Sequence, residues 1–193
     1  MLFSSRRAIF LLCLGLPVFA ASSVPGINNF DQVNAQVYRG AQPNEEGFRY
    51  LAKIGVKTIL DLREDGRRSA TEKRMVVAAG MQYVNVPMTG LIAPTRAQIG
   101  TILALLEDAG KGPVFVHCLR GADRTGAVIA AYRIDHDQWD SARALKEAMA
   151  HGMSFFQIPR QRFIQAFHPQ TETKVPAKTS DSPVALTFLP AVQ

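Results

Sequence analysis

The chain has 193 residues, a formal net charge of +6 and a composition that is 47% hydrophobic and 20% charged. This balance excludes a disordered polyelectrolyte, a collagen-like repeat and a polytopic membrane protein. A chain of this length is expected to form one domain with its own core, and its two cysteines, Cys13 and Cys118, are too few for a disulfide scaffold.

The first 20 residues have the pattern of a secretory signal peptide. Two arginines, Arg6 and Arg7, precede an apolar run over residues 8–19, and the residues up to Ala20 suit a signal peptidase. The run is shorter than the roughly 20 residues that span a membrane. The alternative is an uncleaved anchor that extends to Val24. We expect cleavage near Ala20 and a secreted or periplasmic protein, held at a membrane only if the anchor were retained.

Strand-like and helix-like patterns alternate along the remainder of the chain. In chain order we expect a strand at 37–38, a helix at 44–54, a strand at 56–62, a helix at 70–79, a strand at 82–86, a helix at 95–109, a strand at 113–117, and helices at 125–135, 140–150 and 159–167. This alternation predicts an α/β fold with a mostly parallel central sheet of about four to five strands, flanked by helices on both faces.

Some of these helices have recognisable starts. Asn44 is expected to cap the first helix, and Thr95 with Gln98 three residues later has the spacing of a capping box. All the expected elements fall within residues 21–168, the predicted catalytic domain. Residues 169–193 turn to Thr, Ser, Pro and Lys, which predicts a disordered tail.

One segment carries the residue types of a phosphate-binding loop. The strand at 113–117 leads into HCLRGADRTG, with which an apolar helix begins. The loop N–H groups can surround a tetrahedral anion, Gly121 lets the backbone bend, and the helix N-terminus attracts phosphate. The Arg124 guanidinium can bind two phosphoryl oxygens at once. The expected substrate-binding residues are His117, Leu119, Arg120, Gly121, Ala122 and Thr125.

Cys118 is the expected nucleophile. After signal cleavage it would be the only thiol of the chain, which leaves it no internal disulfide partner. Amide donors, a helix N-terminus and Arg124 all favour its thiolate, which could attack a bound phosphoryl group and form a phosphocysteine. Thr125 could hydrogen-bond the sulfur or simply cap the helix. His117 could fix the loop through a ring N–H or be a core histidine.

The segment HCLRGADRTG resembles the signature of the cysteine-dependent protein tyrosine and dual-specificity phosphatases. Segments 38–43, 58–63 and 84–87 are similar to segments of the bacterial, secreted dual-specificity-like branch. The resemblance implies a phosphatase-like fold with the phosphate loop between the last strand and a central helix. It also implies a phosphomonoester hydrolase without a cofactor, acting through phosphocysteine on phosphotyrosine proteins, on phosphoserine and phosphothreonine proteins, or on a small phosphoester.

The general acid departs from the family pattern. Many members use an aspartate on a loop before the signature, but residues 87–97 here contain no carboxylate. Asp123 is the candidate instead, because it lies inside the loop and could reach the leaving oxygen. Myotubularin-like lipid phosphatases and the secreted mycobacterial phosphatase that resembles them carry an aspartate in this role at this position. Alternatively, Asp123 pairs with an arginine and braces the loop; Asp61 or Asp65 would then be the acid.

Several further residues allow only broad expectations. Arg67, Arg68 and Arg120 could add positive charge near the site, favouring an acidic substrate or a second phosphate, or could be solvated surface residues. Structural ion pairs at the sheet edge are expected among Asp61, Arg63 and Glu72, and core or near-core positions for Tyr132 and Trp139. His136, His151 and His168 lack metal-ligand spacing, so no metal site is expected. The dispersed positive charge argues against nucleic-acid binding, and a monomer is expected.

Other functions remain open at this stage. A phosphoinositide or inositol phosphate phosphatase is one alternative, although the loop lacks the lysine common in lipid phosphatases. A catalytically weak phosphate-binding module is another, but pure binding needs no nucleophile. A sulfur-transfer or arsenate-reducing enzyme is the third. Arsenate reduction normally needs further cysteines, and sulfur-transfer loops generally lack the Arg124-Thr125-Gly126 ending.

Overall fold

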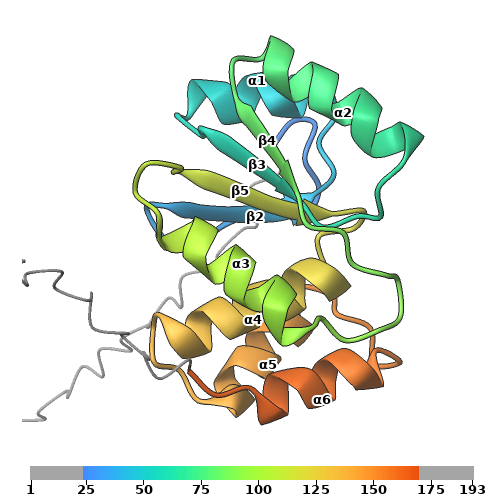
Figure 1. Ribbon diagram of the computed structural model, residues 1–193, viewed down its shortest axis with the longest axis vertical. Helices are drawn as coiled ribbons and strands as arrows, with labels where there is room; N and C mark the ends of the chain where they lie inside the picture. Colours follow the sequence, from blue (N-terminus) through green and yellow to red (C-terminus); the bar gives the residue numbers. More distant parts are fainter. Residues whose placement is uncertain (1–23, 170–193) are drawn as a thin grey trace, which may run out of the picture.

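A five-stranded sheet separates two layers of helices in the computed structural model, which describes residues 24–169 (Figure 1). Its strands are β1 (Asp31–Gln32), β2 (Val37–Ala41), β3 (Thr58–Asp61), β4 (Gln82–Asn85) and β5 (Val114–Cys118), in the spatial order β1-β2-β5-β3-β4. β1 pairs antiparallel with β2, and all other neighbours pair parallel. The predicted α/β class with a mostly parallel sheet is confirmed. The sequence does not predict β1, since two residues are too few to show an alternating pattern.

The helices lie close to their expected positions. They are α1 (Glu45–Lys53), α2 (Arg67–Ala78), α3 (Arg96–Glu107), α4 (Asp123–Asp135), α5 (Ser141–Ala150) and α6 (Ile158–Ala166). Asn44 caps α1 by accepting a hydrogen bond from the Gly47 N–H, and Thr95 forms the predicted capping box with Gln98. α2 begins three residues before the expected start, because the Ser69 hydroxyl accepts from the Gly66 N–H and stabilises the extra turn.

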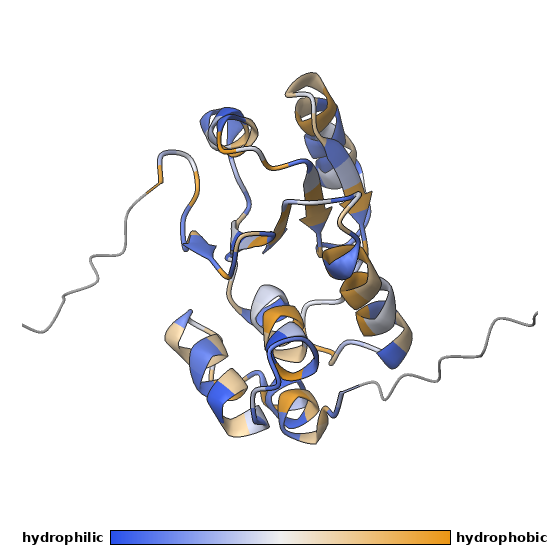
Figure 2. Ribbon diagram, turned by 90° about the vertical axis from the view of Figure 1, so that its left-hand side faces the viewer, coloured by the Kyte–Doolittle hydropathy of each residue, from blue (hydrophilic) through white to orange (hydrophobic). Residues whose placement is uncertain are grey.

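Each face of the sheet has its own hydrophobic core. α1 and α2 cover one face, where Phe48, Ile59 and Phe115 pack together, whereas α3 to α6 cover the other, around Val116 and the buried helix α4 (Figure 1). Figure 2 shows the outer helices with hydrophobic and hydrophilic sides. Because successive side chains of β5 point to opposite faces, the strand ends with His117 beside α2 and Cys118 beside α4. His117 and Cys118, which are adjacent in the sequence, therefore lie on opposite faces of the sheet.

Other expectations have mixed outcomes. Tyr132 is buried as expected, whereas Trp139 is only half-buried and lies between the guanidinium groups of Arg133 and Arg143, at 4.5 and 3.6 Å from its ring centre. Within residues 24–169, no helix combines the length and hydrophobicity needed to cross a membrane. The predicted signal peptide over 1–20 and the predicted tail, apart from its first residue, lie outside the described residues.

Candidate active site

The predicted phosphate loop connects the end of β5 to the start of α4. β5 lies between β2 and β3, so the loop emerges at the middle of the sheet, where parallel strands commonly present ligand sites. Gly121 has a φ of +67°, and a Cβ atom at this position would lie 2.3 Å from the carbonyl carbon of Gly40 on β2. The bend at Gly121 is therefore open only to glycine, for conformation and for space.

β2 and the residue that follows it form hydrogen bonds to this loop. The fully buried Arg39 donates from Nη2 to the Gly121 carbonyl oxygen at 2.9 Å, and the Gln42 N–H donates to the Leu119 carbonyl oxygen at 3.3 Å. Burial lowers the pKa of Arg39 to about 10, although Glu147, Asp31 and Cys118 act in the opposite direction. The sequence does not reveal this role for Arg39, because an arginine in a short strand has no local feature that predicts burial.

Cys118 lies at the base of the loop as a buried free thiol. Burial by itself raises its pKa, but the opposing interactions are stronger together, and the net effect lowers the pKa below the ordinary cysteine value. These interactions come from the hydroxyl and backbone N–H of Thr125, the charge of Arg124 and the backbone N–H of Arg120. The Thr125 hydroxyl is buried and makes no other hydrogen bond among the described residues, so it is available to the sulfur.

Arg124 lies in the first turn of α4, and its Nη1 donates to the carbonyl oxygen of Met88 at 3.2 Å. It also lines a pocket of about 250 Å³, together with Arg63, Glu64, Arg68 and Leu119. Arg68 and Arg124 can offer positive charge to an anion in this pocket, whereas the guanidinium of Arg63 is already 2.6 Å from two carboxylates. Arg68 thus lies at the candidate site, as the sequence allowed, whereas Arg67 does not line this pocket.

A buried cluster of charged residues lies directly beneath the loop. Arg63 Nη2 is 2.6 Å from both Asp61 Oδ2 and Glu72 Oε2, and His117 Nε2 is 2.8 Å from Glu72 Oε1. These ion pairs were expected among Asp61, Arg63 and Glu72 at the sheet edge. That location is wrong, because β3 is an interior strand and the cluster lies between β3, β5 and α2. The link from Glu72 to His117 needs the fold of α2, which residue spacing does not supply.

His117 lies between the phosphate loop and α2. Its Nδ1 is 3.3 Å from the Cys118 carbonyl oxygen, and its Nε2 is 2.8 Å from Glu72 Oε1. The ring therefore links the start of the loop to the buried carboxylate of α2. Burial raises the pKa of Asp61, but Arg63 and His117 lower it more strongly, so this carboxyl remains ionised.

Three side chains of this cluster could in principle hold a metal ion, judged among the described residues. The ligand atoms of Asp61, Glu72 and His117 lie within 4.8 Å of one another. The guanidinium of Arg63 already contacts both carboxylates, so it supplies the positive charge that a metal ion would bring. The spacing of residues along the chain does not predict this group, because its three members come from β3, α2 and β5.

Asp123 is the first residue of α4 and is mostly buried. Its Oδ2 is 2.5 Å from Arg120 Nη2, and its Oδ1 accepts a hydrogen bond from the Ser154 N–H at 2.9 Å. The structure thus contains the ion pair with an arginine that a bracing role predicts, and it engages both oxygens of the Asp123 carboxylate. Asp61 is fully buried in its ion pair, which removes it as an acid, and Asp65 is engaged at the start of α2 by Ser69.

Arg160 of α6 is a further buried residue that the sequence did not identify. Its guanidinium donates to the carbonyl oxygens of Thr89 and Gly90 at 2.6 and 2.8 Å, in the loop between β4 and α3. Burial and the nearby charge of Arg124 lower the pKa of Arg160, whereas the charges of Asp123 and Cys118 act to raise it. An arginine in a short amphipathic helix is typical of a surface, so its sequence context misleads.

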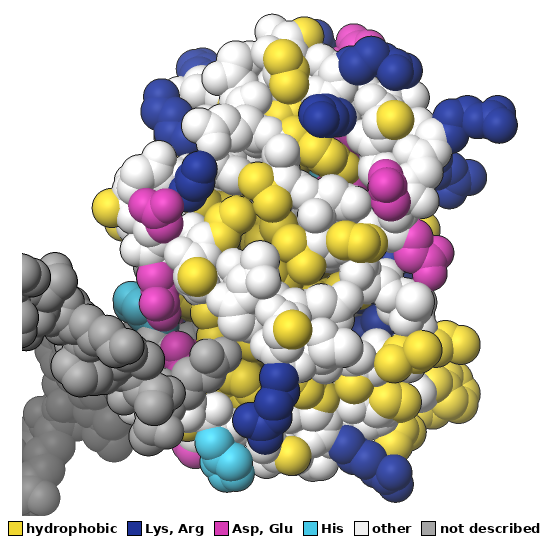
Figure 3. Space-filling view, in the orientation of Figure 1, with side chains coloured by type: hydrophobic (Ala, Val, Ile, Leu, Met, Phe, Trp, Pro, Cys, Tyr) yellow, Lys and Arg dark blue, Asp and Glu magenta, His cyan; other side chains and the backbone are white. Residues whose placement is uncertain are grey.

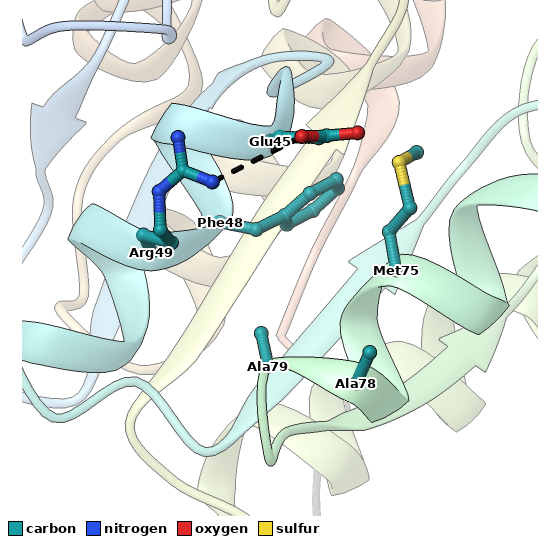
Figure 4. A pocket seen from close by; sticks show the side chains of 6 residues that line it. All are labelled: Glu45, Phe48, Arg49, Met75, Ala78 and Ala79. Atoms are coloured by element: carbon teal, nitrogen blue, oxygen red, sulfur yellow. Dashed lines mark ion pairs between the residues drawn. The ribbon is translucent and has the colours of Figure 1, made fainter.

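A second cavity, of about 260 Å³, lies between α1 and α2 (Figure 4). Phe48, Met75, Ala78 and Ala79 line it together with an exposed pair, Glu45 and Arg49, whose charged atoms are 3.9 Å apart. It contains no nucleophile and no anion-binding loop. Of the phosphate-loop residues, Leu119 and Arg124 line the pocket described above and none lines this second cavity.

Comparisons with known proteins agree with this geometry. The family model described as "DSP-PTPase phosphatase fused to NAD+ Kinase" matches residues 18–166. The dual specificity protein phosphatase TpbA of Pseudomonas aeruginosa is 32% identical over 137 residues, which cover 70% of this chain and 59% of that protein. The crystal structure of TpbA superposes with a TM-score of 0.64 and 27% identity, covering 77% of this chain and 90% of that one. A TpbA structure in complex with phosphotyrosine has a TM-score of 0.62 and 26% identity, over 72% and 83% of the two chains.

Two plant proteins are also similar. The probable chloroplastic NAD kinase 2 of Oryza sativa subsp. japonica is 29% identical over 116 residues, which are 58% of this chain and 12% of that protein. The inositol diphosphatase DSP5 of Arabidopsis thaliana is 28% identical over 111 residues, or 54% of this chain and 53% of that protein. The chain thus spans less than two thirds of the length of each of these curated relatives.

Proposed function

Because this chain belongs to the DSP-PTPase family of cysteine-dependent phosphatases, matched over residues 18–166, we propose that it hydrolyses phosphomonoesters through a phosphocysteine. Phosphotyrosine proteins are the proposed substrates, with phosphoserine and phosphothreonine proteins as further ones. The observation that carries the proposal is the lowered pKa of Cys118 at the base of a loop that can bind an anion. The similarity to TpbA, determined in complex with phosphotyrosine, supports this substrate class.

The reaction would proceed in two displacements at phosphorus. The Cys118 thiolate attacks the phosphoryl group, the S–P bond forms, and the bond from phosphorus to the substrate oxygen breaks. That oxygen leaves as an alcohol or phenol once it has taken a proton from the general acid, for which Asp123 is the candidate. Water then attacks the phosphocysteine and gives a proton back to the carboxylate of the general acid, the S–P bond breaks, and inorganic phosphate leaves with the thiolate regenerated.

The remaining loop groups would stabilise charge during both steps. The Arg124 guanidinium faces the pocket and can bind two phosphoryl oxygens. The N–H groups of residues 119–122 and the N-terminus of α4 can donate to the phosphoryl oxygens. The Thr125 hydroxyl can donate to the sulfur when it leaves as a thiolate in the second step. The His117 ring, whose Nδ1 is 3.3 Å from the Cys118 carbonyl oxygen, would help to hold the start of the loop in place.

The covalent mechanism is tested by Cys118→Ser. Turnover of p-nitrophenyl phosphate is expected to fall by roughly a thousandfold or more, because serine has no comparable anionic nucleophile. Binding of inorganic phosphate to the variant, measured by calorimetry, checks that the loop is intact. Wild-type turnover by the variant would exclude the phosphocysteine. A wild-type protein that binds phosphate but turns nothing over would instead be a binding module.

A phosphatase of inositol phosphates or phosphoinositides is the second candidate. Arg68 and Arg124 in one pocket favour it, as does the similarity to the inositol diphosphatase DSP5. A panel of phosphotyrosine peptides, phosphoserine peptides and inositol phosphates separates the two. We expect the highest kcat/KM with phosphotyrosine peptides, and a higher value with inositol phosphates would favour the second candidate.

We also propose that the protein is exported and acts as a monomer, without membrane attachment. The pattern of residues 1–20 supports export. Mass spectrometry of the protein recovered outside the cytoplasm should give an N-terminus close to residue 21, and light scattering should give the mass of one chain. An N-terminus at Met1 in the membrane fraction would favour the uncleaved anchor instead.

A further inference from the structure

Exposed apolar side chains are unevenly distributed over this protein. Among the described residues, eight large hydrophobic side chains are exposed, and six of them lie on three segments around the candidate site. We call these six the apolar rim: Leu91 75%, Ile92 65%, Leu119 52%, Phe155 65%, Phe156 76% and Ile158 44% exposed. Single exposed apolar residues need no explanation, but a group of this kind commonly marks a binding surface.

The three segments of the apolar rim are fastened to one another and to the phosphate loop. Arg160, at the start of α6, donates to the carbonyl oxygens of Thr89 and Gly90, directly before Leu91. The Ser154 N–H, directly before Phe155, donates to the Asp123 carboxylate. Leu119 belongs to the loop itself and lines the pocket beside Arg124. A substrate whose phosphate lies in this loop therefore has the apolar rim as its immediate surroundings.

The exposed aromatic pair is the largest part of this surface. The rings of Phe155 and Phe156 are 3.8 Å apart between centres, in the connection between α5 and α6. Figure 3 shows hydrophobic side chains gathered at its lower right, over the connection that leads into α6. Aromatic side chains of this size contribute most of the binding energy in many protein interfaces, because they lose large areas of contact with water.

The site thus has two sides of different chemistry. One side is the pocket with Arg63, Arg68 and Arg124, which suits the phosphate. The other side is the apolar rim, which would gain nothing from a highly charged inositol phosphate. A bilayer is bound most simply by one continuous apolar face, whereas the side chains of the rim come from three segments, one of which, through Leu119, also lines the pocket beside Arg124.

We propose that the apolar rim binds the polypeptide on either side of the phosphorylated residue, so that the enzyme selects protein substrates with apolar side chains next to it. This inference rests on the proposed phosphatase function and narrows its substrate class. The phosphate and its arginine contacts give the common part of the affinity. The apolar neighbours give the selective part, because burial of half of one such side chain is worth about tenfold in affinity.

The test compares two phosphotyrosine peptides that differ only in their neighbours. One has leucine or phenylalanine on both sides of the phosphotyrosine, and the other has serine and glycine there. The wild-type enzyme is expected to favour the apolar peptide by about tenfold in kcat/KM, mainly through KM. The Phe155→Ser/Phe156→Ser variant should bring this ratio close to one. The matched control, Val77→Ser/Met149→Ser, removes the two exposed apolar side chains outside the rim and should keep the wild-type ratio.

Each other outcome overturns the proposal in a recognisable way. Equal kcat/KM values for the two peptides with the wild-type enzyme would overturn the inference and leave the phosphatase function intact. If the control variant also lost its preference for the apolar peptide, the apolar rim would be excluded as the cause of that preference. A third outcome would assign the rim to a bilayer: the wild-type enzyme binds phosphatidylcholine–phosphatidylglycerol vesicles, the double Phe variant does not, and the two peptides have equal kcat/KM values. No turnover of either peptide or of p-nitrophenyl phosphate would overturn the proposed function itself.

Discussion

At the scale of single residues, the state of Cys118 depends on a balance of opposing effects. Burial in the core beside α4 disfavours the thiolate, whereas Thr125, Arg124 and the Arg120 N–H favour it, and the net effect lowers the pKa. A lowered pKa means that the thiolate persists at lower pH than in an ordinary cysteine. At a given pH a larger fraction of Cys118 is therefore thiolate than of an ordinary cysteine, which favours its proposed role as the nucleophile.

Removal of the Thr125 hydroxyl should shift this balance. Thr125→Val keeps the shape of the side chain but loses the hydrogen bond to the sulfur, so the pKa of Cys118 is expected to rise. The rate of alkylation by iodoacetamide, measured against pH, should then reach its midpoint at a higher pH than in the wild type. Thr71→Val, which removes an exposed hydroxyl on α2, is the control. An unchanged midpoint in Thr125→Val would exclude its role in stabilising the thiolate.

The role of Asp123 can be separated from that of its partner Arg120. A general acid matters most for poor leaving groups, so Asp123→Asn should reduce kcat for an alkyl phosphate by roughly 10²–10⁴-fold and for p-nitrophenyl phosphate far less. Arg120→Gln removes the ion pair but keeps the carboxylate. If Asp123 only braces the loop, both variants should reduce activity on both substrates to a similar extent.

At the scale of elements, the site is built by β5, the loop and α4 against the end of β2. The geometry at Gly121 requires both a positive φ and the space beside Gly40. Arg39 then fixes the bend by its bond to the Gly121 carbonyl oxygen. The loop is thus shaped before phosphate binds, so little ordering is needed on binding.

Gly121→Ala is expected to disrupt this arrangement. The added Cβ collides with the Gly40 backbone, so the loop has to move and turnover of p-nitrophenyl phosphate should fall. The strained φ alone costs about 1–3 kcal/mol of stability. Gly80→Ala is the matched control, because Gly80 has a φ of +79° but no atom within 4 Å of the added Cβ. Both variants should have a lower Tm than the wild type, but only Gly121→Ala should lose turnover of p-nitrophenyl phosphate. Equal turnover by the two variants would contradict the claim that the loop needs the space beside Gly40.

At the scale of the whole molecule, the buried charge cluster joins α2 to the centre of the sheet. Asp61 is the last residue of β3 and Arg63 follows shortly after it, whereas Glu72 comes from α2 and His117 from β5. The cluster therefore connects one helical layer to the strand that carries the proposed nucleophile. Asp61 also accepts a hydrogen bond from the Tyr83 hydroxyl at 2.7 Å, which adds β4. Loss of one partner would leave a buried charge without its counter-charge.

The contribution of this cluster to stability should depend on pH. Because the folded-state pKa of Asp61 is lowered from 3.8, its contribution is present above that value and is lost as the pH falls through the folded pKa. Asp61→Asn should lower the free energy of unfolding by about 3–5 kcal/mol at neutral pH. The difference from the wild type should narrow in acid below about pH 3.8. The control is Asp65→Asn, whose side-chain oxygen can still accept hydrogen bonds at the start of α2, and its free energy of unfolding should match that of the wild type at every pH. If the loss of stability in Asp61→Asn did not change with pH, the ion pair would be excluded as its cause.

Local sequence determined a large part of this protein. Alternating apolar strands and capped helices predicted the α/β class, and the boundaries agree within a few residues because caps such as Asn44 and Thr95 act on their own helices. The composition of HCLRGADRTG predicted the anion-binding loop, because those residues are consecutive and the loop is a local structure.

Only the tertiary structure decided which distant residues meet at the site. Glu72 against His117, Arg39 against Gly121, and Arg160 against Thr89 and Gly90 join segments that lie 45 to 82 positions apart in the chain. The apolar rim is likewise assembled from three separate segments. Such contacts depend on how the layers pack, and a residue's own neighbours in sequence carry no information about the partner it meets across the fold. For that reason the chain alone could indicate Cys118 as the proposed nucleophile and the loop around it, whereas the charges that support this loop and the residues that surround it could not be predicted.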